Sequence, residues 1–275
     1  MSEPSIVALI PARAGSKRIQ GKNIKPLAGY PLLAYTVAAA HQSGVFAAIL
    51  VSSDSGAILE TARNYGPTCG LECPLSVAHK DMDADIQWVE HAFQEAKWAR
   101  GISEADDETL AEKFDAFAIL RPTSPFRTAD TIHRAWQQWL ERGQDYDSMR
   151  AVEPVQQHPC KVHSIVSMSW SGQECLRSCC DAGRLHGYYI PSRTTPHHSS
   201  PTQSLPKLYA QNASLEIAWT KTVTEKHSIS GALIMPFFTE GYEGINLDTM
   251  DDWYLAETLI ERGLAKLPEV GLVEV

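Results

Sequence analysis

The sequence predicts an α/β protein built on a doubly wound, mostly parallel sheet. Three short apolar runs, at residues 6–10, 48–51 and 116–120, have the character of strands buried on both faces. Helical patterns alternate with these runs along the first half of the chain, as they do in proteins with parallel sheets. In such sheets ligands bind beyond the carboxyl ends of the strands, so the loops after these three runs are the expected walls of a site.

Each predicted helix has a signal of its own. Pro31 suits the first helical position, and the later helices show apolar residues at a spacing of three or four. Trp136 and Trp139 share one helical face, which favours a place in the core over a surface for stacking bases. The expected helices cover residues 31–40, 56–65, 86–96 and 128–142, and a last one ends near Arg262. Two further strands are expected at residues 213–219 and within 231–238.

The domain organisation follows from composition along the chain. We predict a single domain over residues 1–275, with an inserted lobe at residues 155–207. That segment is rich in Ser, Pro, His and Cys and has few periodic runs, and loops of such length are usually functional or disordered.

Charge and hydropathy exclude some classes of protein. A net charge of −9 and a pI near 5.6 argue against nucleic-acid binding, which usually needs a basic face. No apolar run is long enough to span a membrane, and the short first run lacks a preceding basic segment, so we expect a cytoplasmic protein. In that reducing compartment the 6 cysteines are expected mostly as thiols, and their spacings do not match the usual zinc pairs.

A basic loop, "PARAGSKRIQGKN", follows the first predicted strand. It is one residue too long for a P-loop, with Asn23 where that motif has a hydroxyl, and it lacks the glycines of a dinucleotide fold. Its small residues can instead expose backbone N–H groups to an anion. Arg13, Lys17 and Lys22 can neutralise a triphosphate and the pyrophosphate that leaves. This arrangement favours nucleotidyl transfer, in which the α-phosphorus is attacked.

The longer segment "IPARAGSKRIQGKNIKPLAGYPLLAYTV" closely resembles the first motif of the acylneuraminate cytidylyltransferases. "VSSDS", "LRPTSPFRTADTI", "LYAQNASLEIAW" and "NLDTMDDW" follow in that family's order. The resemblance implies a fold of the nucleotide-diphospho-sugar transferase type. It also implies that CTP and a sialic acid-like keto-sugar acid give a CMP-sugar and pyrophosphate, with Mg²⁺. Members are typically homodimers, so the inserted lobe is expected to serve sugar binding and dimerisation.

The chemistry of the loops and the resemblance together assign residues to roles. Catalysis falls to Arg13, Lys17 and Lys22. Nucleotide binding falls to Ala12, Arg13, Ala14, Gly15, Ser16, Lys17, Lys22 and Asn23. Contact with the sugar falls to Arg121, Ser124, Gln211 and Asn212, and metal binding to Asn246 and Asp248.

Three positions depart from the family pattern. The family usually has Asp at the place of Asn246, Gln at that of Arg121, and often Arg at that of Cys73. These changes spare the phosphate loop but alter the surroundings of the metal, the sugar and the base. They leave open a non-catalytic binding homologue, another nucleotide such as GTP, or another acid such as Kdo, pseudaminic or legionaminic acid.

Overall fold

The computed structural model describes residues 3–66, 68–74, 85–95, 110–158, 163–167, 174–178, 201–205 and 207–271. Contacts divide the chain into two compact units. The first comprises Met1–Val152 and Gln211–Val275, and the second comprises Glu153–Ala210. The second unit contains the segment for which the sequence predicts an inserted lobe.

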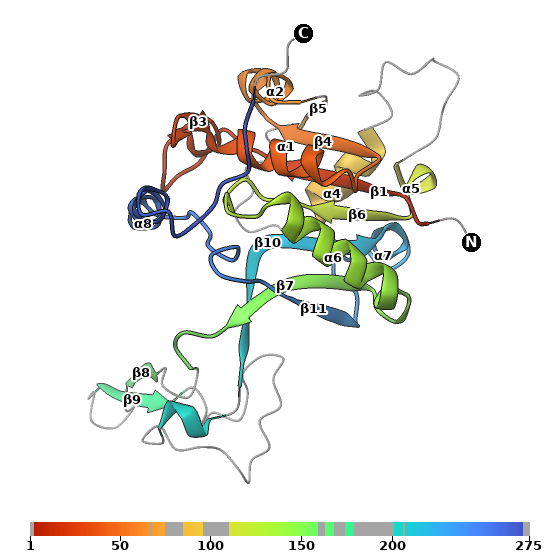
Figure 1. Ribbon diagram of the computed structural model, residues 1–275. Helices are drawn as coiled ribbons and strands as arrows, with labels where there is room; N and C mark the ends of the chain where they lie inside the picture. Colours follow the sequence, from red (N-terminus) through yellow and green to blue (C-terminus); the bar gives the residue numbers. More distant parts are fainter. Residues whose placement is uncertain are drawn as a thin grey trace, which may run out of the picture. The chain divides into compact units, whose positions relative to one another are not determined.

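A seven-stranded sheet forms the centre of the first unit, in the order β11-β7-β10-β6-β1-β4-β5 (Figure 1). Its strands are β1 (Ile6–Pro11), β4 (Ala48–Ser53), β5 (Cys69–Glu72), β6 (Ala116–Ile119), β7 (Ser148–Pro154), β10 (Tyr209–Trp219) and β11 (Ile234–Phe238). β1 pairs in parallel with β4 and β6, β4 with β5, and β7 with β11. β10 runs antiparallel to β6. The predicted mostly parallel α/β sheet is therefore confirmed, with one antiparallel exception.

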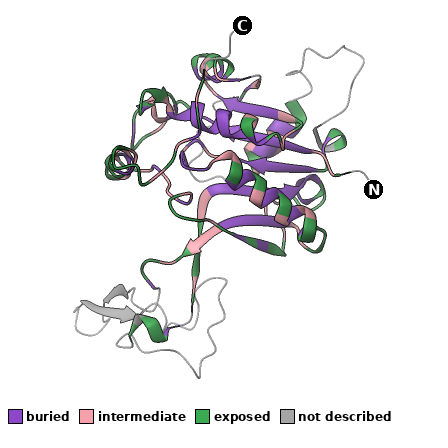
Figure 2. Ribbon diagram, in the orientation of Figure 1, coloured by how far each residue is buried: buried purple, intermediate pink, exposed green. Residues whose placement is uncertain are grey.

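Helices cover both faces of this sheet, and Figure 2 shows the strands buried between them. One face carries α1 (Leu32–Ser43), α2 (Gly56–Arg63) and α6 (Ala129–Arg142). The other face carries α4 (Ile86–Glu95), α5 (Leu110–Lys113) and α7 (Thr220–Thr224). On β1, Ile6, Ala8 and Ile10 enter the first core while Val7 and Leu9 enter the second, so its unbroken apolar run is explained. Trp136 and Trp139 are buried in the first core, as predicted.

A third apolar core joins segments that lie far apart in the sequence. It packs Ile19 of the basic loop against Leu247 and Trp253 at the far end of the chain, with Phe126 between β6 and α6. The hairpin of β2 (Pro26–Leu27) and β3 (Tyr30–Pro31) and the 3-10 helix η1 (Lys22–Ile24) complete the basic segment. This core brings the basic loop beside the turn that precedes α8 (Met250–Glu261).

Within the second unit, β8 (His163–Ser167) pairs antiparallel with β9 (Glu174–Ser178), and the 3-10 helix η5 covers Thr202–Ser204. Most of the predicted lobe, including Cys179 and Cys180, lies outside the described residues. No helix in the described part of the chain is both long and apolar enough to cross a membrane.

Candidate active site

A cavity of about 770 Å³ lies at the carboxyl ends of β1, β4 and β6. Its walls come from the loops after these strands, the amino end of α4, β10 and the turn before α8. The three loops that the sequence nominated as site walls therefore meet at one cavity. All of the lining residues belong to the first unit.

The loop after β1 is held in shape by side chains from other segments. At distances of 2.7 to 2.8 Å, Ser53 donates to the carbonyl of Ala12, Asn23 donates to the carbonyl of Arg13, and Asp54 accepts from the N–H of Ala14. Asn23 is only 5% exposed, so its amide braces the loop from beneath. The sequence assigned Asn23 to nucleotide contact, and it does line the cavity, but it also sets the course of the loop.

Lys22 connects this loop to the turn before α8. Its Nζ donates to the carbonyl of Leu247 at 2.8 Å and to Oδ1 of Asp248 at 3.2 Å, across a separation of 226 residues. Arg18 lies 3.5 Å from the same carboxylate oxygen. Burial lowers the pKa of Lys22, and the charge of Asp248 partly offsets this effect. The basic loop and the acidic turn therefore form one electrostatic unit.

The turn itself presents oxygen atoms. Asn246 donates through Nδ2 to Oδ2 of Asp248 at 2.6 Å, while its buried Oδ1 takes no hydrogen bond from a described residue. Oxygen donors suit Mg²⁺, which proteins often bind through one or two carboxylates together with substrate phosphates. In the described residues no group of three or more His, Cys, Asp or Glu could hold a metal. Asn246 and Asp248 both line the cavity and bring to it oxygen atoms of the kind that Mg²⁺ prefers.

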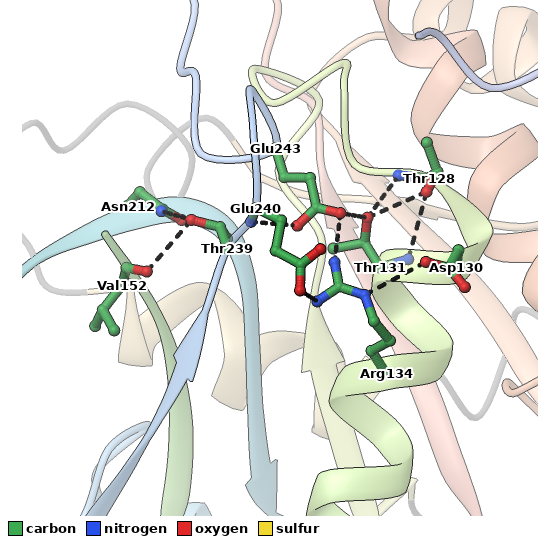
Figure 3. Close-up of polar contacts among 9 residues, drawn as sticks. All are labelled: Thr128, Asp130, Thr131, Arg134, Val152, Asn212, Thr239, Glu240 and Glu243. Atoms are coloured by element: carbon green, nitrogen blue, oxygen red, sulfur yellow. Dashed lines mark hydrogen bonds and ion pairs between the residues drawn. The ribbon is translucent and has the colours of Figure 1, made fainter. Parts of the chain in front are cut away.

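The segment from β11 to this turn is anchored to the start of α6, as Figure 3 shows. Glu243 accepts hydrogen bonds from Oγ1 of Thr131 at 2.7 Å and from Nη2 of Arg134 at 2.5 Å. Four residues later, Leu247 donates its N–H to the carbonyl of Thr123 at 2.8 Å. These contacts tie the turn that carries Asp248 to the loop after β6.

Asn212 acts on the same segment. Its Nδ2 donates to Oγ1 of Thr239 at 2.9 Å, and that hydroxyl donates to the carbonyl of Val152 at 3.3 Å (Figure 3). β10, β7 and the end of β11 are thus linked at one point. Neither Gln211 nor Asn212 lines the cavity, although Ala213 does.

Arg121 lines the cavity at the end of β6. Its Nη2 donates to Oδ2 of Asp85 and to Oε1 of Glu216, both at 2.7 Å. The other carboxylate oxygen of Glu216 contacts Nη1 of Arg150. Ser124, three residues after Arg121, is fully buried and supports the loop without lining the cavity.

Arg127 was not recognised from the sequence as part of this region. It is 1% exposed, donates to the carbonyls of Arg121 and Ser214, and reaches Oγ1 of Thr36 at 2.8 Å. Burial lowers the pKa of Arg127 to about 9. The sequence feature that could have identified it is an arginine in the loop that follows a predicted strand. Its contacts hold the loop after β6 to α1 and β10.

Most of the predicted site residues meet in the cavity. Those that line it are Ala12, Arg13, Ser16, Lys17, Lys22, Asn23, Arg121, Asn246 and Asp248. Ala14, Gly15, Ser124, Gln211 and Asn212 do not line it. Asp85 and Trp88 line it without having been predicted, and Asp54, which was not assigned a role, lies in the loop after β4 that was expected to form a wall. Cys73 also lines it, and burial raises the pKa of its thiol.

The fold and the cavity bring a basic loop after the first strand beside an acidic turn at the carboxyl edge of the sheet. The family model for cytidylyltransferases matches residues 7–168. The chain belongs to the cytidylyltransferase family.

Individual relatives agree with this assignment. The chain is 31% identical to a CMP-N,N'-diacetyllegionaminic acid synthase of Legionella pneumophila, over 93% of this chain and 96% of that protein. It is 36% identical to an N-acylneuraminate cytidylyltransferase of Escherichia coli, over 47% of this chain and 27% of that protein. A solved CMP:2-keto-3-deoxy-manno-octonic acid synthetase complexed with CTP shares the fold, with a TM-score of 0.60 at 12% identity, covering 94% of this chain and 100% of that one.

Proposed function

We propose that this enzyme transfers CMP from CTP to a sialic acid-like keto-sugar acid and releases pyrophosphate. The observation that carries the proposal is the contact of Lys22 with Asp248. This contact brings a loop suited to bind a triphosphate beside a turn suited to bind a metal ion, in one cavity. The full-length similarity to a CMP-legionaminic acid synthase supports the sugar class. The similarity to two such synthases also favours CTP over other nucleotides.

The proposed reaction is an in-line displacement. A hydroxyl of the sugar attacks the α-phosphorus and releases its proton to solvent, a new P–O bond forms, and the bond from the α-phosphorus to the oxygen that bridges to the β-phosphate breaks so that pyrophosphate leaves. Arg13, Lys17 and Lys22 bind the triphosphate and stabilise the charge that develops on the leaving group. Ala12 and Ser16 line the cavity beside these cations, and the hydrogen bonds of the loop to Asp54 and Asn23 keep it in place.

We assign the magnesium ion to Asn246 and Asp248. When bound, it would neutralise phosphate charge and polarise the reacting phosphoryl group. The orphaned Oδ1 of Asn246 and the carboxylate of Asp248 support this assignment, because both are oxygen donors on one turn. Lys22 lies beside the same carboxylate, so the metal ion and the Lys22 ammonium would both neutralise the negative charge of the bound phosphates.

Arg121 is our principal candidate for sugar contact, because it is a cation that lines the cavity and does not belong to the phosphate loop. Ser124, Gln211 and Asn212 are assigned to the sugar end as residues that shape its surroundings. We also propose a cytoplasmic homodimer in which residues 155–207 serve sugar binding and dimerisation, on the strength of the family resemblance. Light scattering on the purified protein tests the dimer, and a monomeric mass would refute it.

The test of the activity is a substrate panel. Purified enzyme with magnesium and CTP is given N-acetylneuraminic, N,N'-diacetyllegionaminic, pseudaminic and 3-deoxy-manno-octulosonic acids in turn, and pyrophosphate release is measured. We expect release with at least one nine-carbon acid and with CTP in preference to GTP, UTP and ATP. If the folded protein releases pyrophosphate with none of these pairs, the proposed activity is wrong.

A further inference from the structure

Four charged side chains form a continuous chain of ion pairs at one wall of the cavity. Arg150 on β7 contacts Glu216 on β10, Glu216 accepts from Arg121 at 2.7 Å, and Arg121 donates to Asp85 at 2.7 Å. Asp85 immediately precedes α4. The chain of ion pairs thus begins inside the sheet and ends at the cavity, which both Arg121 and Asp85 line.

The exposed fractions of the four side chains divide them into a buried ion pair and a partly exposed ion pair. The side chains of Arg150 and Glu216 are both 5% exposed, those of Arg121 and Asp85 are 23% and 40% exposed. Breaking the buried pair would leave a buried charge without a partner, which is strongly unfavourable. An ion pair as exposed as that of Arg121 with Asp85 contributes little and is easily exchanged.

Removing Asp85 from this chain of ion pairs would leave one positive charge unbalanced at the cavity wall. Arg150, Glu216 and Arg121 together carry one net positive charge, which Asp85 balances. Both contacts of the Arg121 guanidinium use Nη2, and its Nη1 and Nε groups donate to no described residue. A carboxylate that replaced Asp85 on Nη2 could therefore also bind an adjacent N–H group, in the bidentate geometry that guanidinium favours.

Asp85 also has a structural role at the start of α4. It stands at the amino end of α4, where an acidic residue is favourable, and its Oδ1 accepts from Nε1 of Trp88 at 3.1 Å. These contacts explain why Asp85 is acidic. They do not explain why a guanidinium fixed by a buried carboxylate faces the cavity, and Asp85 keeps its hydrogen bond from Trp88 if Arg121 is taken from it.

We propose that Arg121 binds the carboxylate of the sugar acid, and that Asp85 is its resting partner, which the substrate displaces. This inference rests on the proposed function and names the residue that selects the acid. Glu216 and Arg150 are positioning residues, because they hold the guanidinium at the wall without reaching the cavity. The ligand class is thus a keto-sugar with a free carboxylate.

The two members of the exposed pair should respond with opposite signs. Arg121→Gln removes a charge-assisted contact, so KM for the sugar acid should rise about 10- to 100-fold while KM for CTP stays within about twofold. Asp85→Asn removes the competing carboxylate, so KM for the sugar acid should fall about two- to fivefold. Arg121→Lys should raise KM for the sugar acid less than Arg121→Gln does, because lysine keeps the positive charge but cannot form the bidentate contact of a guanidinium. Glu90→Gln removes a carboxylate from the same helix, outside the cavity, and should change neither KM.

A chemical test separates carboxylate recognition from a merely structural effect. The sugar acid with the highest kcat/KM in the panel is compared with its C1 carboxamide, in the wild type and in Arg121→Gln. We expect the wild type to prefer the acid at least about tenfold, and the variant to lose most of that preference. Equal preference in both proteins would overturn the inference, as would a rise of KM in both Arg121→Gln and Asp85→Asn.

The result remains decisive if the proposed activity fails. Should the wild type release no pyrophosphate, the same acids are titrated calorimetrically in the presence of CTP and magnesium. Binding by the wild type that is lost in Arg121→Gln supports the role of Arg121. Binding that is equal in the two proteins, or no binding of any acid, refutes it.

Discussion

Replacing Lys22 by Met keeps the length of the side chain and removes its charge. The side chain is 12% exposed, and its Nζ has acceptors at 2.8 Å on Leu247 and at 3.2 Å on Asp248. Each charge-assisted bond contributes about 1.5 to 3 kcal/mol, but the ammonium no longer has to be desolvated in the variant. We therefore expect the free energy of unfolding to fall by only about 2 kcal/mol, as measured by urea denaturation.

The effect on catalysis should be larger. Removing one donor that stabilises developing charge typically lowers kcat by about 100- to 1,000-fold, and Lys22 would contact the leaving pyrophosphate. Pyrophosphate release at saturating CTP, with the sugar acid chosen from the panel, measures this loss. Lys25→Met is the matched control, because Lys25 lies 5.2 Å from the ring of Trp253 and does not line the cavity. A folded Lys22→Met enzyme with kcat within about threefold of the wild type would refute the role of Lys22.

The pH dependence gives a second test of the same residue. Burial lowers the pKa of Lys22 below its ordinary value of 10.5, so the ammonium loses its proton at a lower pH than an exposed lysine does. Between the lowered and the ordinary pKa the folded protein binds fewer protons than the unfolded chain, so the stability contribution of this group rises with pH while activity falls. Lys22→Arg should move the alkaline limb of kcat to higher pH, and an unmoved limb would contradict the assignment.

Three further predictions concern the turn, the metal and acid stability. Glu243→Gln should lower kcat about tenfold or more by loosening the segment that carries Asp248, whereas Glu240→Gln, whose side chain is 75% exposed, should not. Asn246→Asp should lower the magnesium concentration for half-saturation about tenfold, measured by calorimetry and by activity. Asp147→Asn should lower the free energy of unfolding by about 1 to 3 kcal/mol at pH 7, as followed by urea denaturation across pH.

The controls for these variants are built into the measurements. Equal kcat values for Glu243→Gln and Glu240→Gln would show that the anchor at Glu243 has no catalytic effect. An unchanged magnesium requirement in Asn246→Asp would remove residue 246 from the metal site. The pKa of Asp147 is lowered to about 2 by the hydrogen bond from Lys226 and by two backbone N–H groups. Its stabilisation is thus complete above about pH 4 and is lost as the pH falls through about 2, and a constant difference from the wild type over that range would contradict this.

Strands with a continuous apolar run were predictable, whereas β5 and β7, which lack such a run, were missed. β1, β4 and β6 were recognised because both of their faces are apolar. β7 was missed, since its sequence "SMRAVEP" contains Arg150, which is buried only because Glu216 pairs with it across the sheet. β5 was missed because it is only 4 residues long and contains Cys69, Gly70 and Glu72. A pattern of hydrophobicity along the chain cannot report a charge that a neighbouring strand neutralises.

The same limit applies to the roles of single residues. The sequence could place Asn23 in the phosphate loop, but only the packing of that loop shows that its amide braces the carbonyl of Arg13. Gln211 and Asn212 were expected at the sugar, and the fold turns Asn212 toward Thr239 instead of into the cavity. Whether two side chains form a hydrogen bond depends on how the backbone runs at two positions that are far apart in the sequence. The residues around either position do not reveal this.

By itself, the sequence determined the three adjacent parallel strands β6, β1 and β4 and the chemistry of the loop after β1. Apolar runs buried on both faces require helices on both sides, and a basic loop at a strand exit can bind little other than an anion. Only the tertiary structure decided which carboxylates face that loop. The third core packs Ile19 against Leu247 and so brings Lys22 to Asp248, while Glu216 aims Arg121 at the cavity. Contacts across such separations arise from the packing of whole elements, because no local preference of the chain can specify them.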